Sequence, residues 1–182
     1  MIMENVNMGR NVGKKDMVFC IIFADKATPY ENYDCFLNSD DENIRNKANM
    51  NVPMVLAQMR WDGKLGFPGG NVESHHNTLI EAIKSELEEE INLININEDN
   101  LIPLVTFSDE KKHISSFAYK VTYEELKEIQ KNSFNSKHFY TENCGSVLFQ
   151  IHEKSVDNLK QQVFSGTGKD ELLYLIEKMN LI

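Results

Sequence analysis

The feature that most constrains the fold is an amphipathic helix predicted over residues 79–91. Thr78 and Glu81 have the spacing of a capping box, so the helix should begin just after Thr78. Asn92 tolerates the left-handed conformation that ends many helices. At about 100° per residue, one face of this helix collects Ile80, Ile83, Leu87 and Ile91. A helix with such a stripe has to pack against a core.

The remaining segments supply that core. Apolar runs rich in β-branched and aromatic residues predict strands at residues 17–24, 52–60, 101–107, 113–122 and 145–151. Apolar spacing predicts further helices at residues 123–131 and 168–182, whereas residues 30–51 are polar and should form a long surface loop or insertion. Strands and helices interleave without a regular βαβ rhythm. This order favours the α/β class of the α+β type, with a mixed sheet between helices.

Length and composition set further bounds. The chain has 182 residues and a net charge of −9, which fits one domain at residues 17–182 after a flexible, polar N-terminal arm at residues 1–16. The charge disfavours non-specific binding to nucleic acid. The arm has no secretory apolar region, and we expect no membrane partner because apolar runs long enough to span a bilayer are absent. Three scattered cysteines suit a reducing compartment, so an intracellular location, cytoplasmic or nuclear, is expected.

The same helix carries a crowded set of glutamates. Glu86, Glu89 and Glu90 stand at positions i, i+3 and i+4, so their carboxylates share one side of the helix, while Glu88 points elsewhere. A solvated acidic face is the commoner explanation of such a run taken alone. The other explanation is a hard divalent cation, which prefers carboxylate oxygens. A preceding turn with Gly69 and Gly70, whose backbone can approach a ligand closely, favours the cation.

Turn and helix together resemble the signature of the Nudix hydrolases. Its second half fits Glu86, Leu87, Glu89, Glu90 and Leu93. The chain departs from that signature at three positions: Ser85 replaces an arginine, Asn92 replaces a glycine, and Asn77 stands where the first glutamate belongs because the loop is one residue longer. The longer loop and the run QMRWDGKLGFPGG resemble the nucleolar snoRNA-decapping and inosine-diphosphatase branch. This likeness covers residues 56–90 and the tail at residues 163–179.

The resemblance implies a Nudix-type α/β/α sandwich and a Mg²⁺ or Mn²⁺ cofactor. It assigns the metal to Glu86, Glu89, Glu90 and the Gly69 carbonyl, with catalysis by Glu89, Glu90 and Glu142. Glu142 lies at the start of a late predicted strand, where the branch places a further metal-binding or base glutamate. The identity of the general base stays open.

The resemblance also implies the residues that bind substrate: Phe19, Arg60, Phe67, Gly70 and Glu171. Arg60 could pair with phosphate or be a solvated strand-end charge, and Phe67 could stack on a base or pack in the core. Glu171 stands where the branch has a base-reading glutamine, and an ionised carboxylate there favours a purine that offers an N–H. His75 and His76 should be exposed in the loop. Trp61 is expected to pack on its turn, although it could also contact substrate.

Two functions follow. The first is metal-dependent hydrolysis of phosphoanhydrides in purine nucleoside di- or triphosphates, extending to 5′-capped RNA. The second is an RNA- or protein-binding regulator on a catalytically weakened Nudix scaffold, which the changes at Ser85 and Asn77 favour. Retention of three helix carboxylates favours the hydrolase over the regulator, since nothing would offset the repulsion between the carboxylates in an inactive site. The branch tends to dimerise, so a homodimer is a further expectation.

Overall fold

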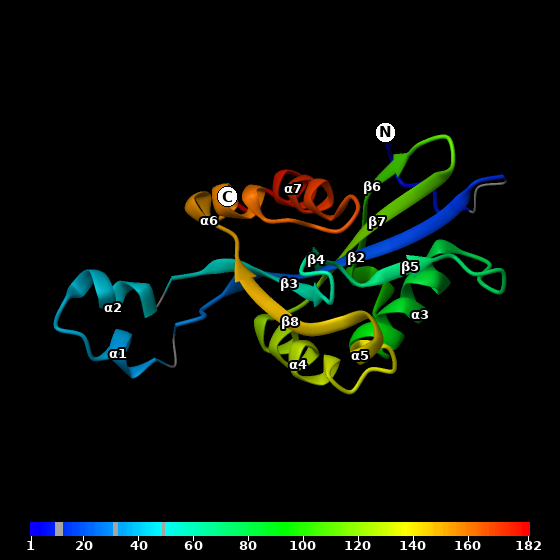
Figure 1. Cartoon of the computed structure of the whole chain (residues 1–182). Helices are drawn as coiled ribbons and strands as arrows, with labels where there is room; N and C mark the ends of the chain where they lie inside the picture. The colour runs from blue at the N-terminus through cyan, green and yellow to red at the C-terminus, as the bar shows by residue number, and fades with distance from the viewer. Residues whose placement is uncertain (10–12, 31–32, 49) are drawn as a thin grey trace.

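A mixed eight-stranded sheet runs through the centre of the protein (Figure 1). The computed structural model describes residues 1–9, 13–30, 33–48 and 50–182. The strand order is β1-β6-β7-β2-β3-β4, with β5 paired to β2 and β8 to β3. Strand β2 is central because it runs parallel to β7 and antiparallel to β3 and β5. The strands are β1 (Ile2–Glu4), β2 (Lys15–Ala27), β3 (Val52–Arg60), β4 (Leu65–Gly66), β5 (Gly69–Asn71), β6 (Leu101–Ser108), β7 (Lys112–Lys120) and β8 (Asn143–Gln150).

Helices cover both faces of the sheet. On one face lie α3 (Leu79–Ile91), α4 (Tyr123–Ser133) and α5 (Phe139–Glu142), and on the other lie α6 (Glu153–Gln161) and α7 (Gly168–Lys178). Alternation along β2 feeds two cores, since Cys20 and Ile22 face α3 whereas Ile21 and Phe23 join the α7 side. The predicted α/β/α sandwich is therefore confirmed.

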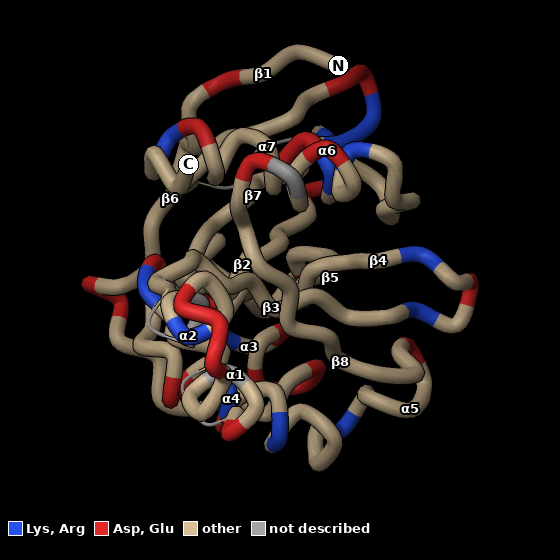
Figure 2. Tube along the Cα trace, turned by 90° about the vertical axis from the view of Figure 1, so that its left-hand side faces the viewer, with Lys and Arg blue, Asp and Glu red and all other residues tan. Residues whose placement is uncertain are grey.

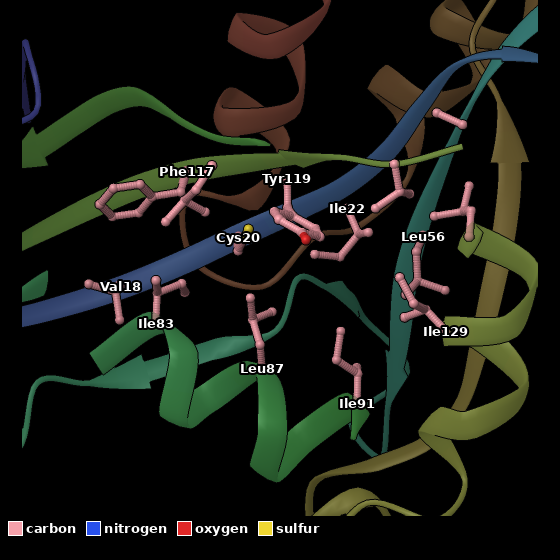
Figure 3. Close-up of a cluster of buried hydrophobic side chains, with 14 of the residues drawn as sticks. Val18, Cys20, Ile22, Leu56, Ile83, Leu87, Ile91, Phe117, Tyr119 and Ile129 are labelled. Carbon is pink, nitrogen blue, oxygen red and sulfur yellow. The ribbon is translucent and has the colours of Figure 1, made fainter. Parts of the chain in front are cut away.

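Helix α3 matches its prediction at both ends. The Thr78 hydroxyl accepts from the Glu81 backbone N–H at 3.1 Å, and Asn92 ends the helix with a φ of 56°. Ile83, Leu87 and Ile91 are fully buried against β2 and β7 (Figure 3). Burying each such side chain contributes about 1.5–3 kcal/mol. This packing fixes which side of α3 its glutamates can present.

Other parts of the chain differ from prediction. The segment at residues 30–51 contains two short helices, α1 (Asp34–Leu37) and α2 (Glu42–Ala48), which project from the sheet at the ends of β2 and β3. Helix α1 has only four residues, and α2 has a polar sequence without an apolar stripe, so periodicity predicted no helix there. Helices α5 and α6 were also missed: α5 has only four residues, and the residues of α6 were not recognised as a helix.

The N-terminal residues are partly structured. Within the predicted flexible arm, Ile2–Glu4 forms β1 and pairs antiparallel with residues 106–108 of β6. Residues 10–12 of the arm lie outside the described residues. The division into an arm and one domain at residues 17–182 stays a prediction. In the described part of the chain, helices of the length and apolarity needed to cross a membrane are absent.

Candidate active site

The two glycines of the turn meet different neighbours. Gly69 has a φ of 150°, and a Cβ there would lie 2.1 Å from the Val18 carbonyl oxygen. A Cβ at Gly70 would instead lie 2.5 Å from Oε1 of Glu86. The turn thus packs against β2 through one glycine and against the α3 carboxylate through the other. Only residues without side chains allow both approaches.

Three carboxyl groups crowd beside this turn. Burial, together with the charges of Glu142, Glu89 and Glu73, raises the pKa of Glu86 to about 7. Glu90 is only 4% exposed, and burial, then Glu142 and Glu86, hold its pKa well above the usual range. Glu142 is the last residue of α5 rather than the first of a strand, one position earlier than β8. The structure therefore brings Glu86, Glu90 and Glu142 together.

Glu89 is turned toward α5. Its Oε2 lies 3.1 Å from Nδ1 of His138, and its Oε1 lies 3.6 Å from Nζ of Lys137. The His138 backbone N–H also donates to the Glu89 carbonyl at 2.9 Å. Glu89 is still near enough to Glu86 to raise its pKa. Glu88 is exposed, in agreement with the sequence prediction.

The donor set fits a hard divalent cation in chemistry, though not as a closed cage. Within the described residues, groups of three His, Cys, Asp or Glu side chains placed to hold a metal are absent. An ion would therefore have to draw the carboxylates together. Two observations favour this: the charges of neighbouring carboxylates raise the pKa of Glu86, and the absence of a side chain at Gly70 leaves room for the Glu86 carboxylate. Carboxylate oxygens suit Mg²⁺ or Mn²⁺.

A pocket on the α7 side gathers four of the five predicted substrate residues. Phe19, Arg60, Phe67 and Glu171 line it together. Phe67 is 4% exposed, and its ring lies 5.9 Å from that of Phe164, so it packs and lines the pocket at once. The fifth residue, Gly70, contacts Glu86 instead.

Glu171 forms the buried end of the pocket. It is 1% exposed, and its two oxygens accept from Thr167 Oγ1 at 2.5 Å and Ser116 Oγ at 3.1 Å. Burial raises its pKa to about 7, against the lowering effect of the two hydroxyls. Each carboxylate oxygen has a further lone pair. Glu171 can thus still accept from a ligand.

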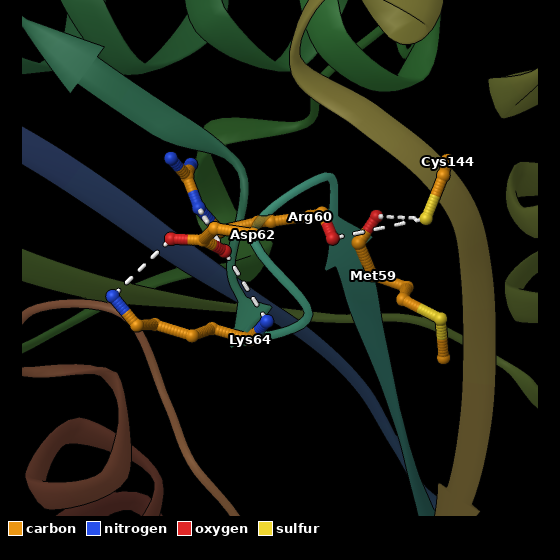
Figure 4. A network of polar contacts seen from close by, with 5 residues as sticks. All are labelled: Met59, Arg60, Asp62, Lys64 and Cys144. Carbon is orange, nitrogen blue, oxygen red and sulfur yellow. Dashed lines mark hydrogen bonds and ion pairs between the residues drawn. The ribbon is translucent and has the colours of Figure 1, made fainter.

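Arg60 stands at the end of β3. Its Nε lies 3.6 Å from Asp62 Oδ1, and the same carboxylate receives Lys64 Nζ at 3.2 Å (Figure 4). The Nε atom of Arg60 is buried, and among the described residues it has no hydrogen-bond partner. Gly66 packs beneath it, since a Cβ there would lie 3.2 Å from Arg60 Cδ. The guanidinium is therefore held at the pocket edge.

One short segment connects pocket and carboxylates. Gly66 and Phe67 line the pocket, and Gly70 contacts Glu86. Four residues of chain span at most about 14 Å. Pocket and carboxylates are therefore close enough for one elongated ligand to reach both.

Sequence reasoning missed several residues near the site. Glu73 contributes charge to Glu86, and Gln58 and Asn143 lie buried at 2% and 1% exposure. Gln58 faces Glu90 and lowers its pKa, yet its Nε2 makes no hydrogen bond of ordinary geometry within the described residues. A polar residue in the apolar run at residues 52–58 was the available signal. His76, predicted to be exposed, is buried, and its Nδ1 accepts from the Glu73 N–H at 3.2 Å, which turns the ring back onto the loop; His75 is exposed, as predicted.

Comparison with known proteins now bears on this site. Residues 34–182 match the family described as "Nudt16-like: U8 snoRNA-decapping enzyme-like". The chain is 30% identical over 140 residues to the U8 snoRNA-decapping enzyme of Xenopus laevis, covering 71% of this chain and 66% of that protein. It is 28% identical over 134 residues to the Tudor-interacting repair regulator protein of Gallus gallus, covering 70% of this chain and 43% of that protein. The chain thus spans two thirds or less of the length of these relatives.

Solved structures agree on the fold. A mutT/nudix family protein from Listeria innocua superposes with a TM-score of 0.59 at 16% identity, covering 93% of this chain and 96% of that one. At this identity the likeness concerns the fold alone. With the family match over residues 34–182, it confirms the resemblance derived from the glycine turn and the glutamate helix. The chain belongs to the Nudt16-like family of Nudix proteins, close to the snoRNA-decapping branch.

Proposed function

We propose that this protein hydrolyses phosphoanhydride bonds in purine nucleoside di- and triphosphates, such as inosine and guanosine diphosphate, and in 5′-capped RNA. The observation that carries the proposal is the contact of Gly70 with Glu86, a few residues from the pocket lined by Phe67. Family membership and the relative named as a U8 snoRNA-decapping enzyme support it.

Each group has a task in this proposal. Phe19 and Phe67 hold the purine, Glu171 accepts a hydrogen bond from its edge, and Arg60 pairs with phosphate. Glu86, Glu89, Glu90 and the Gly69 carbonyl would hold Mg²⁺ or Mn²⁺. Such an ion supplies positive charge that polarises the phosphates and offsets their repulsion of water.

Glu142 is the general base in this scheme. Its side chain is 45% exposed, against 34% for Glu89, and Glu90 is buried. It therefore has the best access to water while standing beside Glu86 and Glu90. A location inside the cell, where nucleotides and capped RNA occur, belongs to the same proposal.

Phosphate release from inosine and guanosine diphosphates, with Mg²⁺ or Mn²⁺, tests this assignment. Glu86→Gln and Glu89→Gln should each lower kcat by about 100-fold, on the scale expected when a catalytic group is misplaced. Glu88→Gln is the matched control, because Glu88 is exposed on the same helix and should keep activity. Full activity in Glu89→Gln would count against this site.

A regulator without catalysis is the second candidate. The pairing of Glu89 with His138, the changes at Ser85 and Asn77, and the relative named as a Tudor-interacting repair regulator protein favour it. Asn77 has an amide side chain and so supplies no carboxylate to the cluster, and its backbone N–H donates to Glu81 Oε2 at 2.7 Å. Inactivity on both nucleotides and on capped RNA would select this candidate.

A further inference from the structure

Two large aromatic side chains are exposed together next to the candidate site. Trp61 is 63% exposed and Tyr140 is 70% exposed. They are joined, because Nε1–H of Trp61 donates to the Tyr140 carbonyl at 3.1 Å. The sequence prediction that Trp61 packs on its own turn is therefore wrong, and most of its ring faces solvent.

Their place in the chain ties both residues to the site. Trp61 follows Arg60, which lines the pocket, and Tyr140 precedes Glu142 by two residues on α5. The strand ends also meet, since Arg60 pairs with Asn143 at the start of β8. Figure 2 shows the tip of the β3–β4 hairpin and α5 at the same edge of the molecule. The two aromatic residues thus lie at the edge where the end of β3, with the pocket residue Arg60, meets the start of β8, next to Glu142.

The chemistry of this pair is that of a stacking surface. The only polar group of the indole is already bonded to Tyr140, so its ring faces remain for contact. The Tyr140 ring is set edge-on against buried Phe139, with centroids 5.2 Å apart, which limits its motion. Rigid aromatic faces bind nucleobases of any identity.

Local charge supports a ligand that carries phosphate. Arg60 and Lys64 flank Trp61 and share one carboxylate, Asp62. Hydrogen bonding from the Lys64 backbone N–H lowers the pKa of Asp62, so it is ionised, yet the turn keeps one net positive charge. Lys137, 71% exposed, lies just before α5, where it pairs with Glu89 at 3.6 Å. The turn at residues 60–64 thus offsets locally a small part of the chain's net charge of −9.

We propose that Trp61 and Tyr140, the Trp61–Tyr140 platform, stack the second nucleoside of a substrate whose first base fills the Phe19–Phe67 pocket. The substrate class is then two nucleosides joined through phosphates, as in a dinucleoside polyphosphate or a capped RNA end. This inference rests on the proposed function and adds which substrates the site prefers.

Fluorescence provides a test that needs no turnover. Trp61 is the single tryptophan of the chain, so intrinsic emission reports on the platform directly. Without added divalent ions, diguanosine triphosphate and a short capped RNA should quench this emission, and guanosine diphosphate should not. Tyr140→Ala should weaken binding of both quenching ligands about 5-fold or more, the effect of losing part of one stacked base. The two ligands separate a free dinucleotide from an RNA end.

Kinetics provide the second test. Trp61→Ala should lower kcat/KM for diguanosine triphosphate or capped RNA about 10-fold more than for guanosine diphosphate. Trp61→Phe keeps a stacking face but loses the Nε1–H bond, and it should restore most of this preference. Tyr33→Ala, another aromatic residue at 56% exposure, is the matched control outside the site.

The outcomes separate this inference from the proposed function. Hydrolysis of guanosine diphosphate with an unaltered substrate ratio in Trp61→Ala overturns the platform and leaves the enzyme. Quenching without hydrolysis supports the platform as a binding site. A change of oligomeric state in Trp61→Ala, with no quenching by either ligand, assigns the aromatic pair to a protein interface and overturns the inference.

Discussion

The carboxylate of Glu86 fills the space that a side chain on Gly70 would need, since a Cβ there would lie 2.5 Å from Glu86 Oε1. We expect Gly70→Ala to push the carboxylate aside without unfolding the protein, because the clash is with the end of a flexible side chain. Activity should fall about 100-fold, the cost of displacing a catalytic group by about an ångström. The free energy of unfolding should change by less than about 1 kcal/mol.

Phosphate release and thermal unfolding measure these two effects separately. Gly145→Ala is the control, since a Cβ at that position would meet no described atom within 4 Å apart from Gly145 and its two chain neighbours. It should leave both quantities near those of the wild type. Loss of stability in Gly70→Ala equal to the loss of activity would contradict a local displacement.

Gly69→Ala should behave in the opposite way. Its Cβ would lie 2.1 Å from the Val18 carbonyl oxygen and 2.6 Å from the Phe19 Cα, both backbone atoms of the central strand. Backbone cannot move aside, so we expect a loss of more than about 3 kcal/mol in the free energy of unfolding. Chemical denaturation checks this against Gly63→Ala, which shares a positive φ but has open space and should lose only about 1–2 kcal/mol. Similar losses in the two variants would show that the positive φ, and not the clash with β2, causes the loss of stability.

The site could be predicted from sequence where spacing on one element decides geometry. Positions 86, 89 and 90 on one helix, with a cap at Thr78, placed the glutamates before any fold was known. Spacing could not show that Glu89 turns to His138, because that contact joins α3 to a segment distant in sequence.

The same limit explains the elements that were missed. Helix α1 is a single turn and α2 is short and polar, so neither could be recognised from periodicity. The position of the exposed Trp61 ring is set by its hydrogen bond to the carbonyl of Tyr140, a residue 79 positions away in the chain. Local pattern therefore predicts which residues an element presents, whereas packing between elements decides what those residues meet.

A divalent cation bound by the glutamates should stabilise the fold. An ion at about 100 times its dissociation constant adds about 2.7 kcal/mol, which corresponds to about 5–10 °C in Tm for a chain of this size. We expect Mn²⁺ to raise the Tm of the wild type and of Glu88→Gln, and a chelator to reverse the rise. Glu86→Gln should lose most of it. Equal shifts in all three proteins would place the ion elsewhere.

Glu171 should make stability depend on pH. Burial raises its pKa in the folded protein to about 7 from 4.5, so the folded state holds a proton that the unfolded chain has lost. Stability therefore falls as pH rises from about 4.5 through 7 and then levels off, by on the order of 3 kcal/mol. Glu171→Gln removes this dependence, so its stability relative to the wild type should increase between pH 5 and pH 8.

Urea unfolding at those two pH values measures the difference, and Glu177→Gln, an exposed change on the same helix, corrects for general effects of charge. The amide introduced by Glu171→Gln meets the same two hydroxyls, those of Thr167 and Ser116, so any constant offset cancels when the two pH values are compared. An equal effect of Glu171→Gln at pH 5 and pH 8 would mean that this carboxyl is ionised throughout. In that event the pocket would present a fixed negative charge, and purines with an N–H donor would be favoured at every pH, which relative rates on inosine, guanosine and adenosine diphosphates would reveal.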